Sequence, residues 1–411
     1  MNLLLQKFSN KESFLWVVVQ QVFVRGLTAL KFFVAARILG PESFAQIGVG
    51  LLAVAMVESL TDTGMQQAVI QKSTQLDHTE AGAVWTLQII RGAVLAFFLL
   101  LVSPYIAEAF SVPSAAGLIA LAAVLPLIRN CLNPGYFSLH RSRNFRAVCF
   151  TEVISVISDG VVAGMLLILG FGPMSVIVGC IVFDSLKVLF SWALWRVRVS
   201  PNIRWTDIAD LTSFGKWVWG ASAVTFFLNQ LDKFLVARLL GATDFGLYQL
   251  ATKIAQLFIS DAAFALGQYL LPNFSREWRE SRDRAIAKYR RVSVQVFVGA
   301  TCAAVALQLL SPVLIPYLLG PAWKAAIEIV QVLAIGMSFN ASIAVVVSFS
   351  RAIGYPKLVT QATILQLLVL AACSPLAIQL WGLLGMAVVM SLCWVTTVFY
   401  LRFAVKKTLA N

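Results

Sequence analysis

Long apolar runs are the feature that most restricts how this chain can fold. The run AVLAFFLLLV at residues 93–102, for example, continues without a polar break. Of the 411 residues, 59% are hydrophobic and 12% are charged, whereas soluble proteins have about 45–50% apolar and about 25% charged residues. A soluble fold has too little interior to hide so much apolar surface, but a lipid bilayer covers it directly. The composition therefore predicts a membrane protein.

Twelve apolar segments are long enough to cross a bilayer as helices, since about 20 helical residues span about 30 Å of hydrocarbon. Their predicted ranges are 14–38, 42–64, 80–104, 114–134, 147–170, 173–195, 214–239, 243–271, 292–318, 323–349, 357–380 and 382–403. A closed barrel would instead show strands of about 10 residues with alternating polarity. The sequence therefore predicts an all-α integral membrane protein with about twelve transmembrane helices.

The basic residues are distributed unevenly over the loops of this topology. The net charge is +13, and of the 32 Lys and Arg residues 22 fall on the surface that carries both termini, three on the opposite surface and seven inside spans. By the positive-inside rule, both termini are predicted to be cytoplasmic. The basic segment SREWRESRDRAIAKYRR at residues 275–291 is expected to contact anionic lipid headgroups. The charge therefore does not indicate a nucleic-acid partner. Separately, the amino terminus shows no small-residue cleavage motif, so no removed signal peptide is expected.

One phrase occurs twice, 201 residues apart. The copies are FVAARILGPESFAQIG at residues 33–48 and FLVARLLGATDFGLYQ at residues 234–249, and they keep a Phe, an Ala, an Arg, a Leu, a Gly and a Phe in register. Each copy covers the turn after the first span of a six-span half, so we infer a duplication. At the helix ends, Gly40 and Gly241 are expected to adopt positive φ, which glycine tolerates before a sharp turn.

The duplication predicts how the chain is divided. Because six is an even number, both halves enter the membrane from the same side and form parallel repeats. The predicted domains are an N-lobe at 1–195, a cytoplasmic linker at 196–213 and a C-lobe at 214–411. Two such lobes are expected to enclose a central cavity and to expose it to each side of the membrane in turn.

Fourteen ionisable residues lie inside the predicted spans. They are Arg25, Lys31, Glu58, Asp62, Arg91, Arg129, Glu152, Asp159, Asp184, Lys187, Asp232, Lys233, Lys253 and Asp261. A charge at the bilayer centre costs on the order of 2.5–3.5 kcal/mol, so these side chains are expected to face the bundle interior. Those near span ends have the alternative of capping helices or reaching the interface. Structural pairing is another alternative, for Asp184 with Lys187 on one helix face and for Asp232 with a neighbour in the other lobe.

Resemblance to a known family is carried by ARILGPESFAQIGVG at residues 36–50 and TDTGMQQAVIQ at residues 61–71. These motifs are similar to the amino-terminal half of the polysaccharide-transporter, or O-antigen flippase, family of the multidrug/oligosaccharidyl-lipid/polysaccharide exporter superfamily. Four segments of the second half resemble the later spans of that family: VARLLGATDFGLYQLATKIAQL, YLLPNFSR, LLGPAWKAAIEIVQVLAIGM and SRAIGYPKL. The resemblance covers nearly the whole chain, but the chain lacks the two further spans of the related lipid II flippases and the Gly-rich polar signatures of the drug exporters.

The resemblance implies transport of an undecaprenyl-diphosphate-linked oligosaccharide from the cytoplasmic to the periplasmic leaflet of a bacterial inner membrane. The polysaccharide would be O-antigen, capsule or exopolysaccharide. The candidate diphosphate-binding residues are Arg25, Lys31, Arg91 and Lys253, because Arg offers bidentate donors and Lys a point charge. Arg25 and Lys31 are six residues apart, roughly 240° around a helix, so a straight helix would not aim both at one point.

Aromatic side chains are candidates for stacking on the sugar rings, and they include Trp217, Trp219 and Tyr248. Such residues also serve as anchors at the membrane interface. The partners implied by the resemblance are the polyprenyl-diphosphate-linked oligosaccharide, membrane lipids, and the polymerase and glycosyltransferases of the same pathway.

The energy source is predicted to be an ion gradient. The sequence has no G-x-x-x-x-G-K-[ST] loop, so ATP hydrolysis by this chain is not expected. The candidate coupling residues are the buried carboxylates Asp159, Asp184 and Asp261, which would bind H⁺ or Na⁺. The six cysteines occur singly, so neither a disulfide framework nor a metal site is predicted.

Two other functions remain open. An ion-coupled drug or small-molecule antiporter of the same superfamily would favour an acidic cavity for organic cations, whereas the charges here are mixed. A membrane glycosyltransferase or polymerase would need acid–base residues outside the membrane, but the longest predicted periplasmic loop, near SPYIAEAFSVPS, has Glu108 as its only carboxylate. Motifs such as HExxH and GxSxG do not occur. The sequence therefore predicts a transporter without catalytic residues, not an enzyme.

Overall fold

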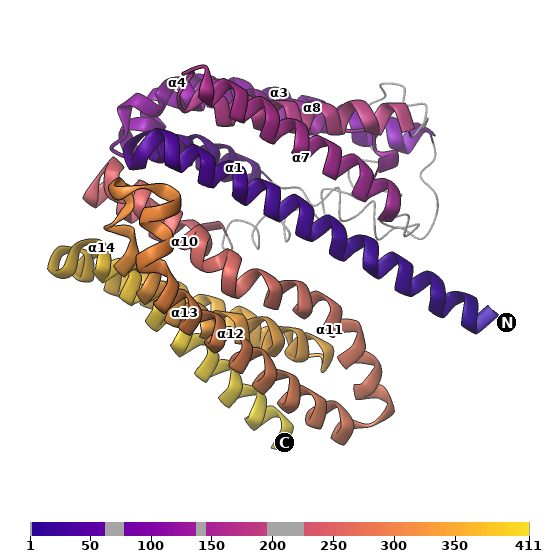
Figure 1. Cartoon of the computed structure of the whole chain (residues 1–411). Helices are drawn as coiled ribbons and strands as arrows, with labels where there is room; N and C mark the ends of the chain where they lie inside the picture. The colour runs from indigo at the N-terminus through magenta and orange to yellow at the C-terminus, as the bar shows by residue number, and fades with distance from the viewer. Residues whose placement is uncertain (1, 62–77, 137–144, 195–225, 411) are drawn as a thin grey trace. The chain divides into compact units, whose positions relative to one another are not determined.

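The computed structural model describes residues 2–61, 78–136, 145–194 and 226–410, and every regular element among them is helical (Figure 1). The first helices are α1 (Asn2–Leu60), α3 (His78–Ala109), α4 (Ala116–Ala122), α5 (Val124–Asn130), α7 (Phe145–Ile168) and α8 (Met174–Leu194). Residues 226–240 are also helical. The remaining helices are α10 (Ala242–Ala255), α11 (Asp261–Glu280), α12 (Arg282–Leu319), α13 (Ala326–Ala352) and α14 (Pro356–Ala410).

Nine helical stretches in the described part of the chain are long and apolar enough to cross a membrane. Two of them are interrupted by a residue with non-helical dihedral angles, Gly40 in α1 and Gly382 in α14. Each of these two stretches therefore holds two of the predicted spans. The seventh predicted span, 214–239, begins outside the described residues. The all-helical membrane class is confirmed, whereas the count of twelve helices stays a prediction.

The outer surfaces of the helices are apolar. On α3, Val94, Phe97 and Leu101 have exposed fractions of 59%, 64% and 58%. Soluble proteins rarely expose such contiguous apolar surface, and a bilayer removes it from water. This surface explains why the sequence shows long apolar runs in place of the one-sided pattern of a soluble helix.

The repeated turn has the backbone conformation that its glycines were predicted to adopt. Gly40 has φ 75° and ψ 175°, and Gly241 has φ 89° and ψ −174°. A third turn, at Gly320, has nearly the same angles, φ 97° and ψ 175°. A side chain at these positions would be strained, because L-residues rarely adopt positive φ. The first and third turns continue with a proline, Pro41 and Pro321, which is favourable at the start of the next helix.

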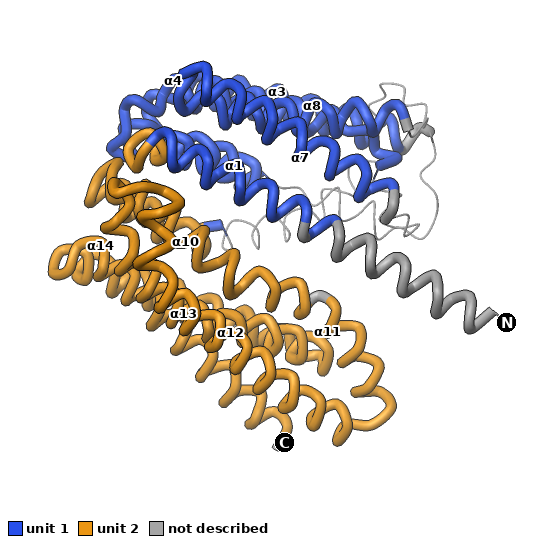
Figure 2. Tube along the Cα trace, viewed as in Figure 1, with its two compact units in different colours: residues 1–39, 46–226 blue, residues 40–45, 227–411 orange. Residues whose placement is uncertain are grey.

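The chain forms two compact units (Figure 2). Unit 1 contains residues 1–39 and 46–226, and unit 2 contains residues 40–45 and 227–411. The predicted linker, 196–213, lies outside the described residues. The lobe boundaries predicted from the sequence therefore stay a prediction.

Residues 40–45 belong to unit 2, although the chain before and after them belongs to unit 1. Phe44 is fully buried, and its ring meets that of Trp323 edge to face, with centroids 5.6 Å apart. The backbone carbonyl of Pro41 lies against Gly246 of α10, where a Cβ atom would collide with it. Gly246, which belongs to the second copy of the repeat, thus packs directly on Pro41.

Gly246→Ala is expected to destabilise unit 2 by about 1–3 kcal/mol, the usual cost of overpacking. The added methyl group would push the backbone of Pro41 away. Thermal unfolding of the purified protein in detergent measures this loss. Gly299→Ala is the matched control, because a Cβ atom there meets nothing within 4 Å. Equal melting temperatures for the two variants would show that the contact does not constrain residues 40–45.

Helix α13 is the central helix of unit 2. It contacts α10, α11, α12 and α14, and small residues allow the closest of these contacts. Gly336 lies against Ser391 of α14, whose hydroxyl donates to the carbonyl of Val332 at 3.1 Å. Below that contact, Phe349 stacks on Tyr289 of α12 with centroids 4.3 Å apart. This packing fixes α13 and with it the polar side chains that α13 directs into unit 2.

Candidate functional site

Unit 1 contains a buried ion pair between two predicted site residues. Lys31 of α1 donates to both carboxylate oxygens of Asp159 of α7, at 2.9 and 2.7 Å. The two side chains are 3% and 5% exposed. Gly179 of α8 makes room for the pair, since a Cβ atom there would collide with the Asp159 carboxylate. The structure therefore joins a predicted phosphate ligand to a predicted coupling residue.

A second network centres on Arg129 at the end of α5. Its Nε donates to Asp184 of α8 at 2.7 Å, and its Nη1 donates to Glu58 of α1 at 2.9 Å. One guanidinium thus holds two carboxylates. The side chain of Arg129 is 38% exposed, whereas that of Asp184 is 9% exposed. Asp184 is therefore paired with Arg129 by a direct hydrogen bond, and not with Lys187 as considered from the sequence.

Lys187 has its own carboxylate partner. Its Nζ lies 3.0 Å from Oε1 of Glu152, a residue of α7. The other oxygen of Glu152 accepts a hydrogen bond from the amide of Gln20. The ring of Tyr136 lies 5.4 Å from Nζ of Lys187. Unit 1 therefore neutralises its intramembrane charges largely by pairing helices that are distant in the sequence.

The other two predicted diphosphate ligands of unit 1, Arg25 and Arg91, form hydrogen bonds of their own. Arg25, six residues before Lys31 on α1, donates from Nε to Gln21 at 2.8 Å. Arg91 of α3 donates from Nη2 to the carbonyl of Glu58 at 2.8 Å and to Thr61 at 3.1 Å. Arg91 is thus a cation at the carboxyl end of α1, where a positive charge stabilises the unpaired backbone carbonyls.

The two remaining predicted residues belong to unit 2. Lys253 lies in the last turn of α10, and Asp261 begins α11. The five-residue π-helical turn Gln256–Ser260 separates them. Asp261 Oδ1 accepts a hydrogen bond from Gln256 at 3.3 Å. Single π-turns of this kind are frequent at functional sites.

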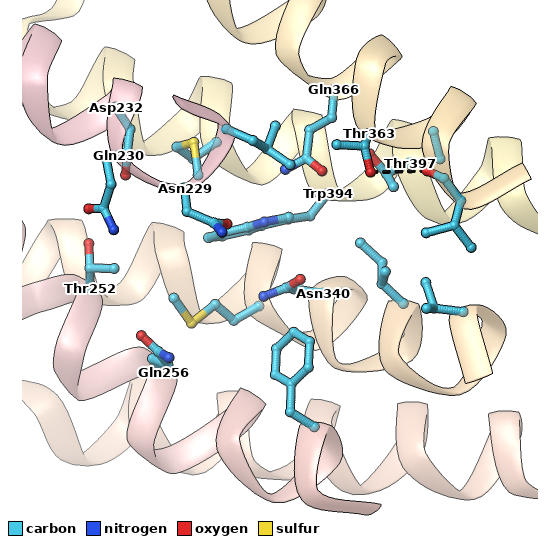
Figure 3. Close-up of a pocket in the computed structure, with 18 of the residues that line it drawn as sticks. Asn229, Gln230, Asp232, Thr252, Gln256, Asn340, Thr363, Gln366, Trp394 and Thr397 are labelled. Atoms are coloured by element: carbon cyan, nitrogen blue, oxygen red, sulfur yellow. Dashed lines mark hydrogen bonds between the residues drawn. The ribbon is translucent and has the colours of Figure 1, made fainter. Parts of the chain in front are cut away.

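Unit 2 contains a polar cavity of about 470 Å³ (Figure 3). Its walls come from residues 226–240, α10, the π-turn, α11, α13 and both halves of α14. The polar residues of the lining are Asn229, Gln230, Asp232, Lys233, Thr252, Gln256, Asn340, Thr363, Gln366 and Thr397. Trp394 lies among them in the close-up. A polar chamber of this size inside helices with apolar outer surfaces suits a water-soluble chemical group held within the membrane.

Asp232 is the acidic residue of this lining. It is 2% exposed, and its Oδ2 accepts a hydrogen bond from the hydroxyl of Tyr248 at 2.8 Å. Its Oδ1 is buried without a hydrogen-bond partner in the described part of the chain. Lys233, its neighbour in sequence, donates instead to Gln230 at 2.7 Å. Pairing of Asp232 with a neighbour in the other lobe was one alternative from the sequence, and the hydrogen-bond partner that the structure gives it is Tyr248 of unit 2.

Two residues of this cavity were not among the site residues predicted from the sequence. Asp232 was not selected as a coupling residue, and Trp394 was not selected as an aromatic candidate. Tyr248, which was selected for stacking on sugars, is fully buried and binds Asp232. Trp217 and Trp219 lie outside the described residues. The available signal for Asp232 was its depth in the seventh predicted span.

The fold is that of known membrane transporters. The chain superposes on the lipid II flippase MurJ in an inward closed conformation with a TM-score of 0.78 and 14% identity, covering 96% of this chain and 87% of that one. It superposes on an inward-facing multidrug resistance MATE family transporter of the MOP superfamily with a TM-score of 0.76 and 13% identity, covering 96% and 98%. The chain thus has the fold of a multi-pass helical membrane protein.

Residues 34–328 match the polysaccharide biosynthesis protein family, and the chain belongs to that family. It is 24% identical over 332 residues to the lipopolysaccharide biosynthesis protein WzxC of Escherichia coli (strain K12), covering 78% of this chain and 65% of WzxC. It is 23% identical over 339 residues to the succinoglycan biosynthesis transport protein ExoT of Rhizobium meliloti (strain 1021), covering 82% and 68%. The match therefore spans about two thirds of the length of these relatives, and the family predicted from the sequence is confirmed.

Proposed function

We propose that this protein moves an undecaprenyl-diphosphate-linked oligosaccharide from the cytoplasmic to the periplasmic leaflet during polysaccharide biosynthesis. The observation that carries the proposal is the polar cavity of unit 2, about 470 Å³ inside apolar helices. A glycan headgroup cannot cross hydrocarbon without losing its hydrogen bonds to water, and each unreplaced hydrogen bond is costly. A polar chamber replaces those bonds while the polyprenyl tail stays in lipid. The names of WzxC and ExoT place both relatives in polysaccharide biosynthesis, which supports the same role here.

The diphosphate is assigned to Arg25, Arg91 and Lys253, with Lys31 in a different role. Lys31 already neutralises Asp159 in a pair that excludes water. Drawing Lys31 toward a phosphate would leave Asp159 as a buried, unpaired carboxylate, which is strongly unfavourable. We therefore assign the Lys31–Asp159 pair to holding α1 on α7, and the cationic contacts to the three other residues.

Coupling to H⁺ or Na⁺ is assigned to Asp232. Asp159 and Asp184, two of the coupling residues proposed from the sequence, each have a cationic partner within 2.7 Å. The hydrogen-bond partner of Asp232, Tyr248, is neutral. The other carboxylate oxygen, Oδ1, is buried and has no hydrogen-bond partner among the described residues. A buried carboxylate in this state favours uptake of a proton or a cation. Asp261, which is half-buried and hydrogen-bonded to Gln256, is the weaker candidate.

The transport cycle follows from the parallel repeats. We assign both termini to the cytoplasm of a bacterial cell, as the distribution of basic loops predicts. Rocking of the two lobes would expose the substrate site to each side of the membrane in turn. The glycosyltransferases of the same pathway would supply the substrate, and the polymerase would use it after transport. A drug antiporter is the nearer alternative, but it would favour an acidic lining for an organic cation, whereas this lining carries one carboxylate, Asp232, and one lysine, Lys233.

Deletion of the gene in its host tests this function. The deletion strain is expected to accumulate lipid-linked oligosaccharide in the inner leaflet and to lose its surface polysaccharide, with both effects reversed by the wild-type gene. Resistance to a panel of toxic organic cations should not change. Loss of cation resistance together with normal polysaccharide would instead identify a drug antiporter.

A further inference from the structure

The cavity of unit 2 has an aromatic ring at its centre. Trp394 of α14 is 7% exposed, and its indole lies in the middle of the cavity with Asn229, Asn340 and Gln366 around it (Figure 3). These three amides come from three different segments, residues 226–240, α13 and α14. A flat apolar surface is thus ringed by groups that can both donate and accept hydrogen bonds.

The amides around Trp394 are available to a ligand. Within the residues that the structure describes, the side chains of Asn340 and Gln366 form no hydrogen bond with another residue. By contrast, amides elsewhere in unit 2 are used for packing. Gln308 of α12 donates to the carbonyl of Gln331 at 2.6 Å, and Gln331 donates to the carbonyl of Gln308 at 3.2 Å. The cavity therefore keeps its amides for something other than helix pairing.

The chemistry of the lining fits an uncharged sugar. A pyranose ring has a face of C–H groups, which packs on an aromatic ring, and a rim of hydroxyls, which amides bind as donors and acceptors. The charged members of the lining are Asp232 and Lys233, and the figure places Asp232 away from Trp394. The volume, about 470 Å³, is within the range of roughly 300–1,000 Å³ that is usual for small-molecule sites.

We propose that this cavity is a monosaccharide subsite that recognises a neutral hexose or N-acetylhexosamine of the transported glycan. Trp394 stacks on one face of the sugar, and Asn229, Asn340 and Gln366 bind its hydroxyl or acetamido groups. This inference rests on the proposed function, since it specifies which part of the lipid-linked oligosaccharide unit 2 holds. Selection among glycans is thereby assigned to neutral hydrogen bonds and stacking, separate from the cationic residues that hold the diphosphate.

Binding to the full-length protein in lipid nanodiscs tests the subsite. The probes are undecaprenyl diphosphate, the same lipid carrying glucose, the same lipid carrying N-acetylglucosamine, and the same lipid carrying glucuronic acid. The wild type is expected to bind at least one of the two neutral glycolipids more tightly than undecaprenyl diphosphate. Trp394→Leu and Asn340→Ala should each lower the affinity for that glycolipid on the order of tenfold. Both variants should leave the affinity for undecaprenyl diphosphate unchanged.

Trp381→Leu is the matched control, because Trp381 lies on the same helix but is 64% exposed. Its affinities should equal those of the wild type. Trp394→Phe keeps a ring in place and should bind with intermediate affinity. Misfolding as the cause of the loss in Trp394→Leu is excluded by its unchanged affinity for undecaprenyl diphosphate.

The outcomes separate the subsite from the function on which it rests. Equal binding of all four lipids by the wild type, or unchanged glycolipid binding in Trp394→Leu, would overturn the subsite and leave the flippase proposal standing. Preference for the glucuronyl lipid would also overturn it, because the proposed subsite takes an uncharged sugar. Failure of the wild type to bind any of the four lipids would overturn both.

Discussion

Replacing Lys31 with alanine is expected to destabilise unit 1 by about 3–5 kcal/mol, the usual cost of removing one partner of a buried ion pair. Asp159 would keep its charge at a position that is 5% exposed and next to Gly179. The thiol of Cys180, a weak donor, lies 3.5 Å from Nζ of Lys31. The expected result is low membrane abundance and a strongly lowered melting temperature in detergent.

The double variant Lys31→Met/Asp159→Leu is expected to recover most of this stability, since apolar side chains can replace a buried ion pair at little cost. Lys288→Ala is the matched control, because Lys288 pairs with Glu277 in a partly exposed position, where an ion pair contributes about 0–1 kcal/mol. Recovery of transport in the double variant would confirm that the pair is structural. A stable double variant without transport would contradict that assignment and return Lys31 to the substrate site.

Asp232→Asn is expected to abolish gradient-driven transport, reducing it at least tenfold to the rate without a gradient. Asparagine keeps the shape of the side chain and the hydrogen bond to Tyr248, but it cannot exchange a proton or balance the charge of Na⁺. Binding of undecaprenyl diphosphate should remain, because the diphosphate is assigned to other residues. Transport by proteoliposomes with and without an imposed H⁺ or Na⁺ gradient measures the effect.

Asp283→Asn serves as the control for Asp232, since Asp283 is exposed in the first turn of α12. Its gradient dependence should match that of the wild type. If Asp232→Asn still responds to the gradient while Asp261→Asn does not, the coupling site is Asp261, as considered from the sequence.

The helical membrane fold was predictable because it depends on local properties of the chain. Apolar runs define spans by their length alone, and Gly40 and Gly241 have the positive φ that their position after a helix requires. The kink at Gly382 was harder to locate, since the predicted boundary at 380–382 rests on a small residue in an otherwise apolar stretch. The third glycine turn, at Gly320, repeats the conformation but keeps less of the sequence pattern.

The candidate site was less predictable, because its partners are distant in the sequence. Lys31 and Asp159 are 128 residues apart, and Arg129 and Asp184 are 55 apart. A pattern on one helix favours Asp184 with Lys187, but α5 and α7 bring closer partners to both. Trp394 could not be recognised either. An aromatic residue in an apolar span gives no sign of whether it faces lipid, a neighbouring helix or a cavity.

Transfer of a lipid-linked oligosaccharide across a reconstituted membrane is the most direct test of the account. Proteoliposomes containing the full-length protein and a fluorescently labelled undecaprenyl-diphosphate-linked oligosaccharide would be exposed to a membrane-impermeant reagent that destroys the label. The account predicts that an imposed ion gradient moves the labelled glycan between leaflets at least tenfold faster than in protein-free vesicles, and that Asp232→Asn removes the gradient's effect. A rate equal to that of protein-free vesicles, from protein that is folded and correctly inserted, would contradict it.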